Sequence, residues 1–364
     1  MEAAKERNFG LDFLRILSML MIVQLHVLGY GGILNNAVEG SIKYWVSWFL
    51  EIAAYCAVNC YAIVSGYVSC NSKAKISRIT ELWFQTIFYT IGITLIMCFF
   101  FNSPLSIKNV VNAVFPITRK QYWYISAYFA LYIFIPLLNN IIKYTNKSTY
   151  TVVLIAIFIA FSCLPTVLLS DPYSMVAGYS AIWLMVLYLL GGYFKKYKIQ
   201  PKNRKGGVFL FLYFVCIFIT FMTKYVLELL NIKQISRMFI TYTSPTIVLA
   251  AVFLFLYCSN LKFLKSKNII KLFAPATLGV YIIHVNPLIW TTFIKDFAVP
   301  FQEDNIVIMF LKICGSVLVI YIVCSIIDII RIRLFKVIKM GVVCLKIENM
   351  FIKVYNKFAI KETT

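Results

Sequence analysis

Three polar residues in the first apolar segment, Asp12, Arg15 and His26, are the side chains best placed to do chemistry. Arg15 and His26 are eleven residues apart, and at about 100° per residue this spacing turns an α-helix roughly three full times plus 20°. They therefore share one helix face, about 16 Å apart along the axis, with Asp12 on nearly the same face. Because a charged group inside a membrane span costs at least ~2.5 kcal/mol and usually faces a cavity, this face is the first candidate for a reaction site.

His26 is the candidate general base of this group. An imidazole exchanges its proton near neutral pH, so His26 is suited to deprotonating a hydroxyl. Arg15 would position or polarise an anionic group, with Asp12 as its ion-pair partner. A structural hydrogen bond from His26 to a backbone carbonyl remains an alternative. Three polar residues that cost free energy to bury in a membrane, all on one helix face, nevertheless favour a polar cavity.

The composition indicates a helical membrane protein. Apolar residues make up 61% of the 364 residues, against roughly 45–50% in a soluble chain. The excess runs along the whole sequence in long segments, which predicts a polytopic all-α bundle and not a barrel of short alternating strands. The first segment carries Arg15 internally and lacks a small-residue cleavage site, so we expect a membrane span and not a signal peptide.

Windows of roughly 20 apolar residues predict about ten membrane spans. Residues 102–121 are predicted to form a loop or re-entrant segment. We expect one transmembrane domain over residues 1–330 and a basic amphipathic tail over 331–364 that lies along the inner leaflet. The predicted spans lie near residues 11–30, 46–69, 80–101, 122–140, 150–169, 180–195, 207–229, 242–259, 272–293 and 306–330.

The distribution of basic residues predicts that both termini are cytosolic. With the N-terminus inside, 25 of the 35 Lys and Arg residues fall in cytosolic segments and 8 in outer segments, which follows the positive-inside rule. The formal net charge of +21 is then explained by basic collars around membrane helices. We therefore expect contact with membrane lipid and no nucleic-acid partner.

Metal ligands are scarce in this sequence. The chain has two histidines, and its ten cysteines lie singly, mostly inside apolar runs. A zinc site takes three or four such ligands grouped together, so we expect no metal and interpret the cysteines as packing residues. Glu51, early in the second predicted span, is an intramembrane carboxylate to which the sequence assigns no role.

The stretch RNFGLDFLRILSMLMIVQLH resembles the N-terminal signature of the membrane-bound acyltransferase 3 family, in which ten residues separate an arginine from a histidine. Arg15 and His26 match that pair. The resemblance covers roughly residues 7–330, although the middle spans match only in hydropathy. The later matches, in the family's order, are Ser65 and Gly66 in AIVSGYV, Lys75 and Arg78 in KAKISR, Trp123, Tyr124 and Pro136 in QYWYISAYFALYIFIPLLN, and Gly279, Tyr281 and His284 in LGVYIIHVNPLIW.

The resemblance implies transfer of an acyl group, commonly acetyl, from cytosolic acyl-CoA to a hydroxyl of a cell-surface polysaccharide or lipid-linked saccharide, in the cytoplasmic membrane of a bacterium. Acyl-CoA would be a substrate, and no bound cofactor is implied. Lys75 and Arg78 lie on the predicted cytosolic side, where their charge suits the phosphates of the donor. Lys75 replaces the first arginine of the family's Arg-x-x-Arg pair, which keeps the charge and loses the bidentate fork.

The other matched residues have both a functional and a structural interpretation. Ser65 and Gly66 would lie near the donor, or bend and pack a helix end. Trp123 and Tyr124 would contact the acceptor, or belong to an aromatic belt. Tyr281 and His284 would line the cavity, or make structural hydrogen bonds. These alternatives stay open at the level of the sequence.

Two mechanisms and a second function also remain open. His26 either deprotonates the acceptor hydroxyl for direct attack on the thioester or carries the acyl group as an acyl-imidazole. The alternative function is a transporter or flippase of lipid-linked saccharides. Such proteins commonly contain two related halves with broken spans at corresponding places, and no such repeat stands out. The acceptor sugar, the acyl chain and the oligomeric state are left undetermined.

Overall fold

The computed structural model of the protein describes residues 7–103, 106–199, 206–263 and 266–361, and this part of the chain is helical without strands. The predicted all-α membrane bundle is confirmed. The longest helices are α1 (Phe9–Gly29), α5 (Ile76–Phe101), α7 (Trp123–Tyr144), α11 (Gly206–Leu229), α17 (Ile306–Val337) and α18 (Met340–Lys361). The medium helices are α3 (Ile42–Ala54), α4 (Ala57–Ser69), α8 (Lys147–Phe158), α10 (Ala181–Lys196), α13 (Pro245–Ser259) and α15 (Thr277–His284). The short ones are α2 (Ile33–Asn36), α6 (Ile107–Val114), α9 (Leu164–Leu168), α12 (Lys233–Ser236), α14 (Lys267–Phe273) and α16 (Pro287–Ile289).

Seven helical stretches among the described residues are long and apolar enough to cross a membrane. A bent pair, Lys267–His284 with Pro287–Ile294, makes eight if it forms one broken span. The predicted count of ten is not confirmed, because α10 and α13 have 16 and 15 residues. At 1.5 Å per residue they reach about 22–24 Å, against a hydrocarbon core of roughly 30 Å. The protein is a multi-pass membrane protein with fewer full-length spans than its apolar segments indicate.

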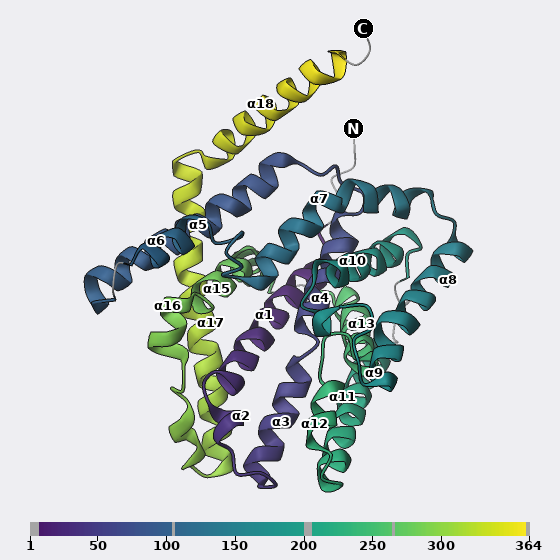
Figure 1. Ribbon diagram of the computed structural model, residues 1–364, viewed down its shortest axis with the longest axis vertical. Coiled ribbons are helices and arrows are strands. Elements are labelled where there is room, and N and C mark those ends of the chain that lie inside the picture. The colour runs from purple at the N-terminus through teal and green to yellow at the C-terminus, as the bar shows by residue number, and fades with distance from the viewer. Residues whose placement is uncertain (1–6, 104–105, 200–205, 264–265, 362–364) are drawn as a thin grey trace.

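The bundle is organised around α1. This helix packs against α3, α4, α13, α15 and α17, so the polar face predicted on it lies inside the protein and not against lipid. Figure 1 shows α3, α11 and α17 running nearly upright in the view, while α1, α5 and α7 cross it aslant. Helix α18 projects beyond the bundle (Figure 1) and contacts α5 and the end of α17.

Polar side chains determine where several of these helices begin. The side-chain oxygen of Asn8 accepts a hydrogen bond from the amide of Leu11 at the start of α1, and Ser180 and Asn305 cap α10 and α17 in the same way. Such caps satisfy backbone amides that have no partner within the helix. The residue before α7, Tyr122, provides no side-chain cap. The amides in the first turn of α7 are therefore left for another partner.

Some predicted segments differ from the observed helices, and some predictions concern residues outside the described ranges. The predicted domain boundary at residue 330 falls inside α17, which continues to Val337. The predicted loop 102–121 contains α6 (Ile107–Val114). Whether α18 lies along the inner leaflet stays a prediction. The basic residues Lys5, Lys202, Arg204, Lys205 and Lys265, counted in the orientation of the chain, lie outside the described residues.

Candidate active site

A cavity of about 310 Å³ lies between α1, α4, α7 and α15, next to the polar face of α1. Its walls come from helices far apart in the sequence, so the fold and not local sequence assembles it. Six of the residues singled out from the sequence line this one cavity: Arg15, His26, Ser65, Trp123, Tyr124 and Tyr281.

His26 and His284 are in direct contact behind this cavity. His26 Nδ1 lies 2.8 Å from His284 Nε2, and His284 Nδ1 lies 2.5 Å from the carbonyl oxygen of Val280. Because a carbonyl oxygen only accepts, His284 Nδ1 carries a proton, and neutral His284 then presents Nε2 as an acceptor. His26 therefore donates through Nδ1 and keeps its lone pair on Nε2. That is the tautomer a general base in the cavity requires.

Helix α15 ends at His284, so the break in the chain lies directly after this buried side chain. His284 is 1% exposed and is the last residue of α15. The buried side chain of Asn286 caps α16 by accepting from the amide of Leu288, and it donates to the hydroxyl of Tyr122 at 2.9 Å. The break after α15 therefore places buried, hydrogen-bonded polar side chains directly after His284.

Arg15 is held in an ion-pair chain at the other end of the α1 face. Its Nη1 donates to Asp12 Oδ1 at 3.0 Å, and Arg7 donates to the second carboxylate oxygen. The hydroxyl of Tyr61 donates to the backbone carbonyl of Arg15 at 2.8 Å, which ties α4 to α1. The pairing of Asp12 with Arg15 that the sequence predicts is present, although Asp12 itself does not line the histidine cavity.

A second cavity, of about 1010 Å³, shares one lining residue, Arg15, with the first. It opens where α1 and α14 begin and where α4, α10 and α13 end, which is the predicted cytosolic side. Asp12 is the one carboxylate among its described lining residues, and Asp12 is already paired twice. The cavity is therefore strongly electropositive. Its basic lining residues are Arg7, Arg15, Lys195, Lys262 and Lys267.

The histidine cavity is also lined by three tyrosines that sequence reasoning did not single out, Tyr61, Tyr128 and Tyr242. Tyr124 and Tyr128 stack with ring centroids 6.2 Å apart, and Tyr124 lies 6.4 Å from Tyr61. Tyr242 stacks on Trp123 at 6.0 Å. The spacing of Tyr124 and Tyr128 by one helical turn was a readable signal, whereas Tyr61 and Tyr242 reach the cavity only through tertiary packing.

The structure does not bring every predicted residue to these cavities. Lys75 and Arg78 are exposed and line neither of them. The backbone of Lys75 is instead bonded to the hydroxyl of Tyr132, which donates to its carbonyl at 2.9 Å. Gly66 is buried against α10. Glu51 is 9% exposed, lines neither cavity and has one carboxylate oxygen without a partner among the described residues.

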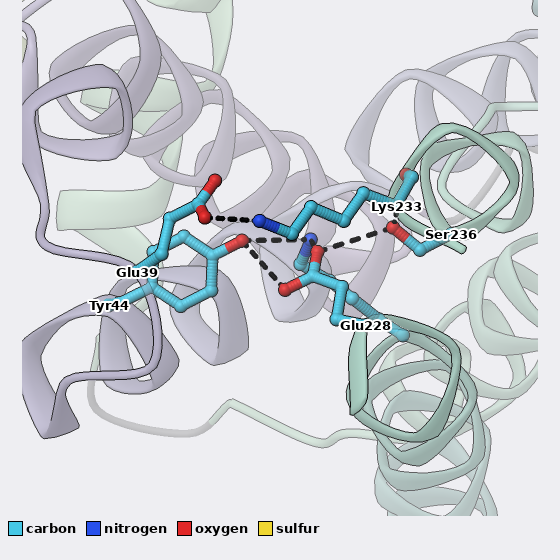
Figure 2. Close-up of polar contacts among 6 residues, drawn as sticks. Glu39, Tyr44, Glu228, Lys233 and Ser236 are labelled. Carbon is cyan, nitrogen blue, oxygen red and sulfur yellow. Dashed lines mark hydrogen bonds and ion pairs between the residues drawn. The ribbon is translucent and has the colours of Figure 1, made fainter. Parts of the chain in front are cut away.

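Figure 2 shows another polar cluster that the sequence did not reveal, where α3 begins and where α11 and α12 end. Lys224 is fully buried and pairs with Glu228, which also accepts from the hydroxyl of Tyr44 at 2.8 Å. Beside it an exposed pair joins Lys233 to Glu39 (Figure 2), and the ammonium of Lys233 lowers the pKa of the Glu39 carboxyl. The cluster lines neither cavity, so it ties α3 to α11 at a distance from the site.

The described residues contain no group of three or more His, Cys, Asp or Glu side chains placed to hold a metal ion. The reactive groups that line the histidine cavity are the His26 imidazole, the hydroxyls of its tyrosines and of Ser65 and Thr277, and the Arg15 guanidinium. Fold and site together define a multi-pass helical membrane protein with a buried cavity beside a pair of histidines in contact.

Comparison with protein families names that class more closely. Residues 8–325 match the acyltransferase 3 family model, an acyltransferase domain. The chain belongs to this family, and it is a membrane acyltransferase. No curated protein and no solved structure matches the chain.

Proposed function

We propose that the protein moves an acyl group, acetyl in the first instance, from cytosolic acyl-CoA to a hydroxyl of a cell-surface polysaccharide or lipid-linked saccharide, in the cytoplasmic membrane of a bacterium. The observation that carries the proposal is that Arg15 lines two cavities, one basic and one lined by His26. Such a pair suits a donor with a phosphorylated nucleotide at one end and a reactive thioester at the other.

The basic cavity is the proposed site for the nucleotide part of the donor. Lys195, Lys262 and Lys267 come from three separate chain segments and converge on one opening, where they would attract phosphate groups by Coulomb interaction. The pantetheine arm would pass Arg15 and bring the thioester toward His26, about 16 Å further along α1. A donor role for Lys75 and Arg78 stays a prediction, because they lie outside this cavity.

His26 is the proposed general base. Its Nε2 takes the proton from the acceptor hydroxyl while the hydroxyl oxygen attacks the thioester carbon. A new carbon–oxygen bond forms, the carbon–sulfur bond breaks, and the CoA thiolate leaves with the proton that His26 removed. In the covalent alternative, Nε2 itself attacks and an acyl-imidazole forms before the acceptor arrives. Brief incubation with radiolabelled acetyl-CoA and no acceptor separates the two, since only the covalent route labels the protein.

The tyrosine-rich wall is the proposed site for the acceptor. Trp123, Tyr124 and Tyr242 present flat apolar faces with polar tips, which complement a sugar ring with its apolar faces and peripheral hydroxyls. The wall lies on the same cavity as His26, so an acceptor held there would meet the thioester at the base.

The direct test is release of CoA thiol by the purified full chain in lipid nanodiscs, measured with acetyl-CoA and a panel of saccharide acceptors. We expect acceptor-dependent thiol release together with a labelled saccharide when the acetyl group is radioactive. If no acceptor elicits thiol release and a deletion strain fails to export saccharide, the proposed transfer reaction is wrong. Transport of lipid-linked saccharides then becomes the better account.

A further inference from the structure

The hydroxyl of Tyr281 is a buried donor without a partner. Tyr281 is 5% exposed and lines the histidine cavity, and its hydroxyl makes no hydrogen bond of normal geometry to any described residue. Buried polar groups nearly always have a partner, and an exception calls for an explanation. A buried hydroxyl without a partner, on a residue that lines a cavity, is a candidate donor to a ligand oxygen.

The first turn of α7 presents further donors to the same cavity. Trp123, Tyr124 and Ile125 are the first three residues of α7, and all three line the cavity. Backbone amides in a first turn have no carbonyl partner within their helix, and Tyr122 supplies no side-chain cap. The positive end of the dipole of this 22-residue helix also lies here. This wall of the cavity therefore favours a negative charge.

Tyr281 is positioned beside these amides by packing on both sides of the helix start. Its ring lies 6.2 Å from the ring of Tyr122 and 6.0 Å from that of Tyr124, and the backbone amide of Tyr124 approaches its hydroxyl oxygen, which leaves the hydroxyl proton free to be donated. Tyr122 is anchored by the side chain of Asn286, which donates to its hydroxyl at 2.9 Å. The donors are therefore fixed before a ligand arrives.

The same packing places these donors close to the base. Tyr281 and His284 are three residues apart on α15, so they lie on one face of that helix. His284 in turn contacts His26 at 2.8 Å. Arg15 is the one charged residue among those that line the cavity, and no carboxylate competes for the donors.

We propose that the Tyr281 hydroxyl and the first-turn amides of α7 form the oxyanion hole of the reaction. When the nucleophile attacks the thioester carbon, the carbonyl π electrons move to its oxygen, which becomes an oxyanion and accepts hydrogen bonds from these donors. When the tetrahedral intermediate collapses, the electron pair on the oxyanion re-forms the carbonyl double bond, the carbon–sulfur bond breaks and the CoA thiolate departs. The inference rests on the proposed function and adds the group that stabilises its transition state.

The test uses Tyr281→Phe in the full chain, with Tyr321→Phe as the matched control. Tyr321 is 4% exposed and its hydroxyl also lacks a partner among the described residues, but Tyr321 does not line the cavity. We expect Tyr281→Phe to lower kcat for thiol release from acetyl-CoA by about 10²–10³-fold, the usual effect of removing one oxyanion donor, with the donor KM nearly unchanged. Tyr321→Phe is expected to keep the wild-type kcat.

Thermal unfolding of the same variants separates a catalytic hydroxyl from a structural one. Because Tyr281→Phe removes an unsatisfied polar atom and keeps the ring, its unfolding temperature is expected to equal or exceed that of the wild type. A wild-type kcat in Tyr281→Phe, a change confined to KM, or a clear loss of thermal stability would each overturn the inference. A wild-type protein that never releases thiol would instead refute the proposed function.

Discussion

At the scale of single residues, the deciding property of the site is which nitrogen of His26 carries a proton. His284 sets this, because its own Nδ1 is committed to the carbonyl of Val280 and its Nε2 faces His26 Nδ1. His284 does not line the cavity. It is therefore a positioning residue that acts through His26, in the way that an orienting carboxylate acts on a catalytic histidine elsewhere.

Replacing His284 tests this role. Phenylalanine removes the acceptor, so we expect His284→Phe to lower kcat by about 10²-fold, at the lower end of what a general base contributes, with little change in donor KM. Glutamine offers a carbonyl oxygen to His26 Nδ1, and His284→Gln should retain clearly more activity. Equal kcat values in the two variants, in proteins with equal unfolding temperatures, would contradict an orienting role.

Spacing alone was enough to predict part of the site at this scale. Arg15 and His26 lie on one face of α1 because their separation fixes it, and Asp12 pairs with Arg15 for the same reason. The contact of His26 with His284 joins residues 258 positions apart, so no local pattern contains it. The partnerless hydroxyl of Tyr281 is likewise a property of the packed cavity.

At the scale of helices, α4 and α10 pack at backbone distance, and two glycines permit this. A Cβ added at Gly66 would lie 1.9 Å from the carbonyl oxygen of Tyr188, and one added at Gly191 would lie 2.0 Å from that of Ile63. Small residues allow membrane helices to approach at backbone distance. Gly66 therefore carries the structural role that the sequence left open, and it positions the neighbouring Ser65 on the cavity wall.

An alanine pair tests this packing role. Gly66→Ala forces backbone from α4 and α10 apart, and we expect a loss of about 1–3 kcal/mol or more in the free energy of unfolding. Gly92 in α5 has nothing within 4 Å of an added Cβ, so Gly92→Ala should be neutral or stabilising by up to ~1 kcal/mol through helix propensity. Thermal unfolding in nanodiscs measures both, and equal unfolding temperatures would refute the close contact.

The predicted spans show what hydropathy conveys about helices and what it omits. Apolar windows located α10 and α13 nearly to the residue, near 180–195 and 242–259. Helices of 16 and 15 residues are shorter than the roughly 20 residues of a full span, and this is why the predicted count of ten is not confirmed. The apolar windows could not show that the second span is divided into α3 and α4, or that α15 stops at His284, since backbone breaks are stabilised by tertiary hydrogen bonds.

At the scale of the whole molecule, the fold places a basic cavity and a histidine cavity in series along α1, with Arg15 lining both. The positive-inside rule assigns the basic opening to the cytosol, where acyl-CoA is found. The sequence predicted this polarity, but it assigned donor binding to Lys75 and Arg78. The lysines that converge on the opening come from α10, the loop after α13 and α14, and only the fold brings them together.

The most direct test of this route is the initial rate of CoA thiol release as a function of acetyl-CoA concentration, measured for the purified wild type and three purified variants. Relative to wild type, His26→Ala should lower kcat by about 10²–10⁴-fold, the contribution of a general base, with a similar donor KM. Lys262→Ala combined with Lys267→Ala should raise the donor KM and leave kcat near wild type. The donor KM of Lys75→Ala combined with Arg78→Ala is measured beside it, because a donor role for Lys75 and Arg78 is also predicted. A wild-type kcat in His26→Ala would contradict the account.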